Sequence, residues 1–425
     1  MRILVLGGTG FIGAALVARL AADGHECVTV SRRKGDGARH IRLDIAAATR
    51  PQDWHAALDG IDAVINAAGA MRDGAGQSPA GVHVKGIAAL YTACEARGVR
   101  RVVHLSAIGV DHEAPSAFSR TKRQGEAILS GRDLDWVILR PSVVIGRSAY
   151  GGSALVRGLA ALPVLPILPQ TAPIQPVHLD DVVETVVRFL EPGAPRQLAL
   201  DLAGPRRIAF DDAVRMFRRW LRLRPAVSLA VPRFLAALFF RLGDLAYALG
   251  WRTPVTTTAQ AEMRRGAAGD PEPWQKAAGI APRDIEAFLR REPASVQERW
   301  FARLYALKPL VFAVFGLFWI ATGLISLGPG FEYGMALLRE GGLPERFGTM
   351  TLVAGALADI VIGCAILYRP LARYGLWAAL IISLTYAVIG TILVPRLWAD
   401  PLGPMLKIWP VLVLNLVAMA IREDR

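Results

Sequence analysis

The last part of the chain contains four long segments with almost no charged side chains. They cover residues 309–328, 349–368, 374–394 and 404–421. A helix needs about 20 mostly apolar residues to cross a bilayer, and each segment approaches or reaches that length. Within them only Asp359 and Lys407 are charged. The sequence therefore predicts that residues 301–425 form an all-α four-helix transmembrane bundle.

Basic residues in the loops predict the orientation of this bundle. One side carries Arg299, Arg303, Lys308, Arg369, Arg373, Arg422 and Arg425. The other side carries Arg339, Arg346 and Arg396, with Lys407 just inside the last segment. Cytoplasmic loops are enriched in Lys and Arg, so both termini are expected in the cytoplasm. The first residues lack the long apolar run of a signal peptide, which gives the same answer. We expect a multi-pass protein of the cell inner membrane with a cytoplasmic N-terminal domain.

Residues 1–300 show a different pattern, in which short apolar runs alternate with helical stretches. The runs expected to be strands are 3–6, 26–30, 63–66, 102–106 and 136–140, and the stretches expected to be helices are 11–22, 82–96, 118–129 and 180–190. Short apolar runs that alternate with helices are typical of a parallel sheet covered on both faces. The sequence therefore predicts an α/β Rossmann fold, a doubly wound parallel sheet, ahead of the membrane bundle.

The region 206–300 is less regular and rich in arginine, and we expect it to form a small substrate lobe of the 1–300 domain. Within it, residues 227–249 are apolar but are interrupted by Pro232, Arg233, Arg241 and Asp244. These interruptions argue against a membrane span, so a helix that packs on the soluble domain is predicted. The alternative is a helix that lies on the membrane surface, which its basic amphipathic character permits.

A glycine-rich loop follows the first predicted strand and opens the first predicted helix. It reads Gly7-Gly8-Thr9-Gly10-Phe11-Ile12-Gly13. Glycine at positions 7, 10 and 13 allows a tight turn, a close backbone approach to a pyrophosphate and close packing of helix on strand. The free N–H groups at the helix start attract phosphate. The loop predicts dinucleotide binding; the alternative is a tight turn alone.

The end of the second predicted strand indicates which dinucleotide binds. An acidic residue there would contact the ribose of NAD, whereas this chain has Ser31-Arg32-Arg33. Arginine suits the 2′-phosphate of NADP by charge and by its two-pronged geometry, so NADP is favoured over NAD. The alternative is a solvated basic loop. Asp44 could contact the adenine edge, and the small residues Ala67, Ala68 and Gly69 let a strand pass close to a cofactor.

These motifs resemble those of the short-chain dehydrogenase/reductase superfamily. The resemblance is greatest to its atypical, NmrA-like branch, which includes an accessory subunit of respiratory complex I. The stretches that carry it are 7–13, 66–69, 104–109, 118–126, 140–146 and 176–182. They follow one another at family spacing over about residues 1–290. Residues 301–425 resemble a DoxX-like membrane domain, on the basis of the four spans and the length.

The resemblance implies a cofactor site and a catalytic group. The residues it places at the cofactor are Gly7, Thr9, Gly10, Phe11, Ile12, Gly13, Ser31, Arg32, Arg33, Asp44, Ala67, Ala68, Gly69, Lys122 and Pro141. The family reduces carbonyls with a serine, a tyrosine and a lysine, of which Ser106 and Lys122 are present. Phe118 stands where the tyrosine, the general acid and base, is expected. Ordinary carbonyl reduction is therefore in doubt.

Three functions remain open at this point. The domain could still transfer hydride, with Lys122, Ser106 or a water molecule handling the proton and a lipid-soluble or quinone-type acceptor as substrate. It could bind NADP(H) without catalysis, as a sensor. It could also be a scaffold or assembly protein for a membrane complex. For Ser106 the alternative is a capping hydroxyl, and for Lys122 a solvated lysine.

The remaining features give weaker indications. Asp359 lies near the middle of the second span, with Gly355 and Gly363 on the same helical face. A carboxylate inside a membrane marks either a functional site or a hydrogen bond to a neighbouring helix, here from Ser383, Tyr386 or Asn415. Cys27, Cys94 and Cys364 are widely spaced, so no metal site or disulfide framework is predicted. The net charge of +13 fits anionic lipids, and no aromatic and basic platform indicates nucleic acid.

Overall fold

The computed structural model describes residues 1–32, 39–74 and 77–423. They form two compact units. The first comprises Met1–Leu245 and Thr253–Ala302, and the second comprises Ala246–Arg252 and Arg303–Arg425. Each unit is described by itself below. The limits predicted for the two domains and for the small lobe remain predictions.

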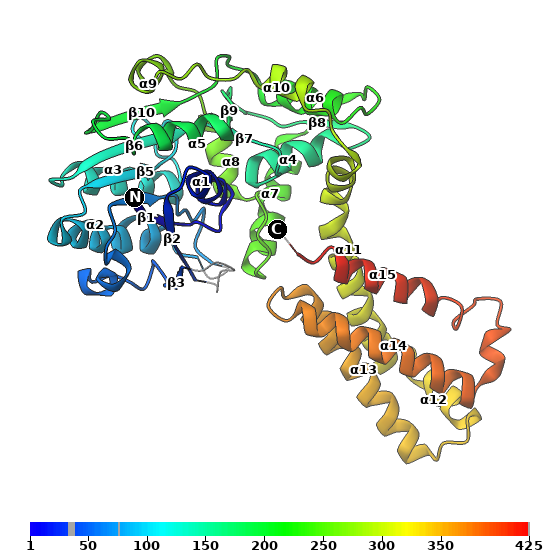
Figure 1. Cartoon of the computed structure of the whole chain (residues 1–425). Helices are drawn as coiled ribbons and strands as arrows, with labels where there is room; N and C mark the ends of the chain where they lie inside the picture. Colours follow the sequence, from blue (N-terminus) through cyan, green and yellow to red (C-terminus); the bar gives the residue numbers. More distant parts are fainter. Residues whose placement is uncertain (33–38, 75–76, 424–425) are drawn as a thin grey trace. The chain divides into compact units, whose positions relative to one another are not determined.

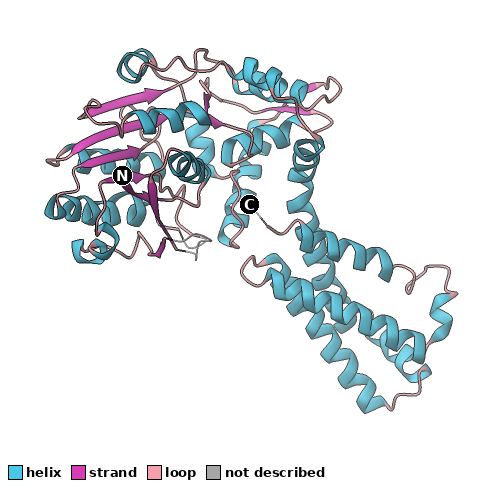
Figure 2. Cartoon of the chain, viewed as in Figure 1, coloured by secondary structure: helices cyan, strands magenta, loops and turns pink. Residues whose placement is uncertain are grey.

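The first unit is built on a seven-stranded sheet in which every neighbouring pair is parallel, and its strand order is β10-β6-β5-β4-β1-β2-β3 (Figures 1 and 2). The strands are β1 Arg2–Leu6, β2 Glu26–Ser31, β3 His40–Arg42, β4 Ala63–Asn66, β5 Arg101–Leu105, β6 Asp135–Pro141 and β10 Leu198–Leu202. The five strands predicted from apolar runs are all present. The chain leaves β1 toward β2 on one side, and later crosses back to β4 on the other. This change of direction creates a crevice at the carboxyl ends of β1 and β4.

Helices cover both faces of this sheet, as the predicted doubly wound fold requires. On one face lie α1 Phe11–Ala22, α5 Leu179–Arg188 and α9 Glu272–Ala278, and their apolar side chains pack with the core that contains Leu16 and Val186. On the other face, α2 Gly86–Arg97 and α3 Ala117–Ser130 contribute to the core around Leu90 and Leu129. The two cores bury both faces of the strands, which explains why the strand sequences are apolar throughout.

Smaller elements complete the first unit. The helices are α4 Gly151–Ala160, α6 Phe210–Trp220, α7 Arg233–Ala248, α8 Thr257–Arg265 and α10 Ile285–Arg291, and the end of α7, from residue 246, belongs to the second unit. The short parallel strand pairs are β7 Val144–Ile145 with β9 Val177–His178 and β8 Leu165–Ile167 with β11 Ser228–Ala230. The helix predicted over 227–249 is therefore wrong at its start. Residues 228–230 form strand β11, and α7 begins only after Pro232, because proline favours the first turn of a helix and not its interior.

The second unit is helical. Its elements are α11 Val296–Leu327, which begins in the first unit, α12 Phe331–Glu340, α13 Glu345–Leu367, α14 Ala372–Leu393, the short η4 Pro395–Trp398 and α15 Ile408–Ala420. Among the described residues, α11, α13 and α14 are long and apolar enough to cross a membrane. The helix within the fourth predicted span has only 13 residues. At 1.5 Å per residue it is about 20 Å long, which is less than the thickness of a hydrocarbon core. Four crossings therefore remain a prediction.

Glycines allow the helices of this unit to approach closely. A Cβ on Gly363 of α13 would lie 2.5 Å from the carbonyl oxygen of Gly316 on α11.

Asp359 is buried between helices, and the Tyr386 hydroxyl of α14 donates a hydrogen bond to its Oδ1 at 3.1 Å. Of the three partners suggested by the sequence, Tyr386 is thus the one observed.

Candidate functional site

The glycine loop joins β1 to α1 and approaches the end of β4 closely. Gly7 has a φ of +74°, and a Cβ on it would lie 2.8 Å from the carbonyl oxygen of Ala67. A Cβ on Gly13 would lie 2.1 Å from the carbonyl oxygen of Gly7. A side chain at either position would therefore collide with backbone. Two of the three positions singled out in the sequence, Gly7 and Gly13, therefore require glycine.

The start of α1 is open to an anion. Its N-cap residue, Gly10, makes no side-chain cap, and the first turn holds no acidic residue. The first N–H groups of a helix lack partners within the helix and carry partial positive charge. In the crevice at the end of β1, these groups form a cradle that suits a pyrophosphate.

Lys122 lies at the neighbouring strand ends. Its side chain is buried, and Nζ donates hydrogen bonds to the carbonyl oxygens of Leu105 at 2.8 Å and Ala68 at 3.3 Å. Burial lowers the pKa of Lys122 to about 8, although the charge of Glu126 opposes the shift. An ammonium group has three donors, so one N–H remains for a ligand after these two bonds. The alternative of a solvated helix lysine is not what the structure shows.

Ser106 follows β5 and has an unsatisfied hydroxyl. Its Oγ is buried and has no hydrogen-bond partner among the described residues. A buried hydroxyl without a partner costs about 1–3 kcal/mol. A ligand in the crevice could supply the missing partner, so Ser106 fits a bound molecule better than it fits the capping role considered from the sequence.

Phe118 stands one helical turn before Lys122 on α3, and it provides no hydroxyl. Its ring packs edge-on against the buried ring of His83, with centroids 5.8 Å apart. Nε2 of His83 accepts a hydrogen bond from the N–H of Ala70, so the ring proton is on Nδ1, which donates to Thr121 Oγ1. Burial, together with the charge of Lys122, holds the pKa of His83 well below its usual value. His83 is therefore neutral near pH 7 and does not replace the missing acid.

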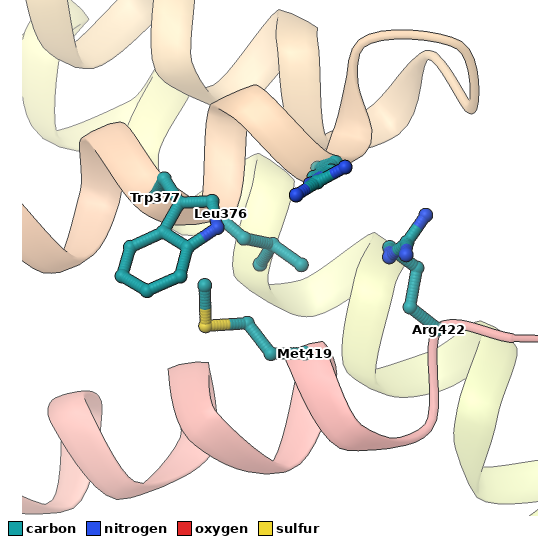
Figure 3. Close-up of a pocket in the computed structure, with 5 residues that line it drawn as sticks. Leu376, Trp377, Met419 and Arg422 are labelled. Carbon is teal, nitrogen blue, oxygen red and sulfur yellow. The ribbon is translucent and has the colours of Figure 1, made fainter.

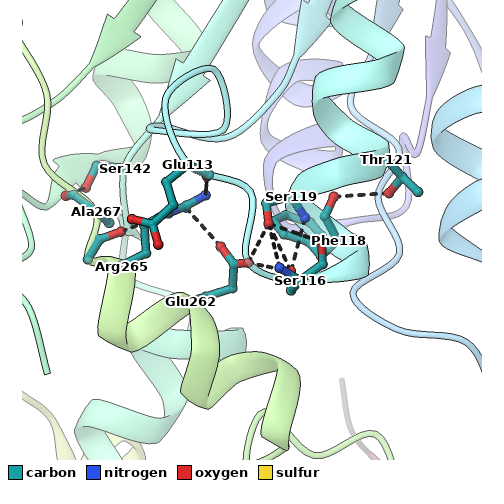
Figure 4. Close-up of polar contacts among 10 residues, drawn as sticks. Glu113, Ser116, Phe118, Ser119, Thr121, Ser142, Glu262, Arg265 and Ala267 are labelled. Carbon is teal, nitrogen blue, oxygen red and sulfur yellow. Dashed lines mark hydrogen bonds and ion pairs between the residues drawn. The ribbon is translucent and has the colours of Figure 1, made fainter. Parts of the chain in front are cut away.

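A cluster that the sequence did not reveal holds the start of α3. Figure 4 shows Glu262 of α8 beside Ser116 and Ser119. Both hydroxyls donate to Glu262 Oε1, the second at 2.9 Å, and Arg265 pairs with Oε2 at 3.0 Å. Ser116 and Ser119 also cap each other's backbone N–H groups. The cluster therefore fixes the first turn of the helix that carries Phe118 and Lys122.

A second missed cluster lies at the end of β6. Arg140 donates two parallel hydrogen bonds to the carboxylate of Glu126, at 3.0 Å and 2.6 Å, and one to Asp111 at 2.5 Å. Glu126 belongs to α3, so the ion pair ties this helix to the sheet four residues after Lys122. No local sequence pattern indicates either cluster, because each joins residues that are far apart along the chain.

The other predicted cofactor residues also lie at the carboxyl edge of the sheet. Thr9, Phe11 and Ile12 belong to the loop and first turn of α1, Ala67, Ala68 and Gly69 follow β4, and Pro141 ends β6. Phe11 stacks on Tyr150, with ring centroids 5.8 Å apart. The roles of these residues remain predictions.

The residues predicted to bind the adenosine end lie beyond β2 and β3. Ser31 ends β2, and Arg32 follows it with an exposed side chain. Arg33 lies outside the described residues. Asp44 follows β3 and accepts a hydrogen bond from the N–H of Ala46 at 3.0 Å, so part of its carboxylate already serves the local turn.

The second unit has a cavity of about 180 Å³, and none of the predicted cofactor residues lines it (Figure 3). Arg373, Leu376, Trp377, Met419 and Arg422 line it. These five side chains include no carboxylate, histidine or nucleophile. The cavity therefore provides no group for proton or acyl transfer.

Comparisons with known proteins agree with this division of the chain. Residues 7–158 match a family described as NAD(P)H-binding, and residues 316–416 match the DoxX-like family. Ceramide reductase of Caulobacter vibrioides is 28% identical over 191 residues, which are 44% of this chain and 60% of that protein. The mitochondrial NADH dehydrogenase [ubiquinone] 1 alpha subcomplex subunit 9 of Dictyostelium discoideum is 26% identical over 224 residues, which are 50% of this chain and 62% of the relative. The chain spans less than two thirds of the length of the curated relatives it matches.

Solved structures show the same fold. MoeE5, in complex with UDP-glucuronic acid and NAD, superposes with a TM-score of 0.53 at 20% identity, over 71% of this chain and 99% of its own. The chain thus combines an NAD(P)-binding domain, whose fold is shared with structures solved in complex with NAD, with a DoxX-like domain that contains candidate membrane spans. This confirms the predicted resemblance and the Rossmann fold.

Proposed function

We propose that this protein is a membrane-anchored oxidoreductase that uses NADP(H) and acts on a lipid-soluble or quinone-type acceptor. The observation that carries the proposal is the buried Lys122, which bonds the carbonyl oxygens of Leu105 and Ala68, together with the unpartnered hydroxyl of Ser106, the residue after Leu105. A dinucleotide fits the residues present, because the loop leaves room for backbone contact and the start of α1 is uncapped. Bound there, the cofactor would supply or accept a hydride.

The residues of the chain then have separate tasks. The loop N–H groups and the start of α1 hold the pyrophosphate, and Arg32 attracts the 2′-phosphate of NADP. Ser106 Oγ donates a hydrogen bond to the acceptor oxygen and orients it. Lys122 Nζ contributes positive charge and, since its pKa is about 8, can release a proton near neutral pH. This assigns to the lysine the proton that Phe118 cannot give.

The names of the relatives support a lipid-soluble acceptor. One relative is called a ceramide reductase, and another is called a subunit of a ubiquinone-linked dehydrogenase. A domain joined to membrane helices meets such acceptors where they are concentrated. We propose an inner-membrane location with both termini in the cytoplasm, as the loop charges predicted.

The presence of Phe118 in place of the tyrosine favours a second candidate function, which is binding without catalysis. Without the family's proton donor, the domain could bind NADP(H) as a sensor or scaffold for a membrane complex. The relative that is a subunit of such a complex supports this second function.

NADPH oxidation by the purified full chain distinguishes the two. The assay uses a panel of quinones, long-chain ketones and small water-soluble carbonyls, with NADPH binding measured in parallel. Turnover with the lipid-soluble members supports the oxidoreductase. Tight binding without turnover of any acceptor supports the sensor or scaffold.

A further inference from the structure

Helix α7 presents apolar side chains on a face that nothing in the first unit covers. Its inner face is formed by Ala236, Phe240, Gly243 and Tyr247, which are buried and follow one another at spacings of three or four residues. On the outer face, six large apolar side chains are between 45% and 71% exposed: Phe234, Leu235, Leu238, Phe239, Leu242 and Leu245. Monomeric soluble domains rarely expose a continuous apolar stripe of this kind, and such a stripe marks a protein or membrane contact.

The end of α7 and the residues after it indicate what covers its exposed apolar face. Residues Ala246–Arg252 belong to the second unit. The indole N–H of Trp251 donates to the carbonyl oxygen of Leu367 at 2.7 Å, and the N–H of Arg369 donates to the carbonyl oxygen of Leu249 at 2.9 Å. Leu367 ends α13, and Arg369 lies in the short connection to α14. The last turn of α7 and the residues after it are therefore held, within the second unit, at the connection between two helices that are long and apolar enough to span a membrane.

The charged residues of α7 also indicate that a lipid bilayer covers this face. Arg233 and Arg241 are exposed on α7 beside the apolar face. Basic side chains that flank an apolar helix face are typical of helices that lie in the interface of a bilayer, because they remain among the anionic headgroups. We propose that the outer face of α7 inserts into the lipid interface and docks the cytoplasmic domain on its own membrane.

The docking helix is also linked to the candidate site. Asp244, on the side of α7 that faces the domain, pairs with Arg72, which lies in the loop after Gly69. Its carboxylate also accepts hydrogen bonds from the N–H and the hydroxyl of Thr257, at the start of α8. Helix α8 carries Glu262, which fixes the first turn of α3. These contacts link the docking helix to the start of α3 within the first unit; the docking itself does not depend on the proposed function.

Site-directed fluorescence tests the proposal on the full chain in lipid nanodiscs. Cys27 and Cys364 are replaced by serine, and the buried Cys94 is kept. An environment-sensitive NBD probe is attached in turn to Leu238→Cys, Leu242→Cys and the control Ala21→Cys, which is exposed on α1. Nitroxide groups on lipid acyl chains quench a probe in the bilayer, and iodide quenches a probe in water.

We expect blue-shifted emission and nitroxide quenching at positions 238 and 242, and iodide quenching with unshifted emission at position 21. Iodide quenching at 238 and 242 equal to that at 21 would show that the face is in water and would overturn the proposal. Protection from both quenchers would also overturn it, because protein would then cover the face.

Discussion

Lys122 and Ser106 are two polar side chains whose burial is not balanced by the protein alone. The ammonium keeps one donor after bonding two strand-end carbonyls, and the hydroxyl has no partner among the described residues. Buried polar groups are normally paired, so such exceptions are commonly found where a ligand binds. Phe118 places no hydroxyl at the position where a tyrosine was expected, one helical turn before Lys122.

Replacing the arginines after β2 tests whether NADP(H) or NAD(H) is the cofactor. In the Arg32→Ala/Arg33→Ala variant, we expect the affinity for NADPH to fall by roughly 10- to 100-fold, since a charged hydrogen bond contributes about 1.5–3 kcal/mol. NADH has no 2′-phosphate, so its affinity should stay the same and serves as the control. Equilibrium titration of both cofactors measures the effect. Unchanged NADPH affinity in the variant would refute the assignment.

Phe118→Tyr tests whether a substrate pocket accepts the family's ordinary proton donor. The new hydroxyl would lie one helical turn from Lys122, whose charge favours a lower phenol pKa. We expect little change in turnover of the lipid-soluble acceptor, because Lys122 already supplies the proton. A gain within the range of about 10²–10⁴-fold that general acid catalysis provides would instead mean that the wild type lacks a working proton donor. The ratio kcat/KM for each acceptor gives the answer.

At the scale of elements, α3 is held at its start by α8 and along its length by β6. Glu262 bonds two hydroxyls of the first turn, and Glu126 pairs with Arg140. These contacts fix the helix that carries both Phe118 and Lys122. They therefore set the geometry of the candidate site without touching a ligand themselves.

The Glu262→Ala substitution tests this role. Loss of two hydrogen bonds to a charged group, and of the ion pair with Arg265, should let the first turn of α3 open more often. We expect amide hydrogen exchange at residues 116–120 to become roughly tenfold faster or more. The control is Glu272→Ala, which breaks an exposed pair with Lys276 on α9. Equal exchange at 116–120 in both variants would contradict the proposed role of Glu262.

Elements with strong local signals were predicted well from the sequence. The bounds of α1 and β4 agree with the predicted 11–22 and 63–66, because each has an apolar pattern limited by glycine or polar residues. The glycine loop was predictable for the same reason. The cluster of Glu262 with Ser116 was not, since 146 residues separate the two and only tertiary packing joins them.

Two predicted elements differed where backbone chemistry overrode the apolar pattern. Hydropathy alone does not distinguish a strand from a helix and predicts one helix over 227–249, although Pro232 separates β11 from α7. Likewise, 404–421 is apolar apart from Lys407 and Asn415, yet turns extend to Lys407 and helix α15 begins at Ile408.

For the whole molecule, the number of membrane crossings decides on which side the chain ends. Asn415 of α15 is buried and donates a hydrogen bond to the carbonyl oxygen of Leu376 at 3.0 Å, so α15 packs against α14 within the bundle. Helix α14 is long and apolar enough to span a membrane, so the packing of α15 against it favours a fourth crossing.

Reporter fusions at the C-terminus test the topology. With four crossings and a cytoplasmic N-terminal domain, we expect an alkaline phosphatase fusion to be inactive and a green fluorescent protein fusion to be bright. As a control, fusions made after residue 342, between α12 and α13, should give the opposite pattern. An active phosphatase at the C-terminus would mean an odd number of crossings.

The rate of NADPH oxidation as a function of pH, in the full chain and in Lys122→Ala, tests the central claim most directly. The assay uses saturating NADPH and a quinone or long-chain ketone in nanodiscs, with Lys85→Ala as a control that removes an exposed lysine. A lysine that donates a proton must be protonated, so the wild-type rate should be constant below its pKa of about 8 and fall above it. We predict that Lys122→Ala lowers the rate by about 10²–10⁴-fold and abolishes this pH dependence, whereas Lys85→Ala retains both. Wild-type protein that binds NADPH but reduces no acceptor at any pH, or a Lys122→Ala variant as active as wild type, would contradict the account.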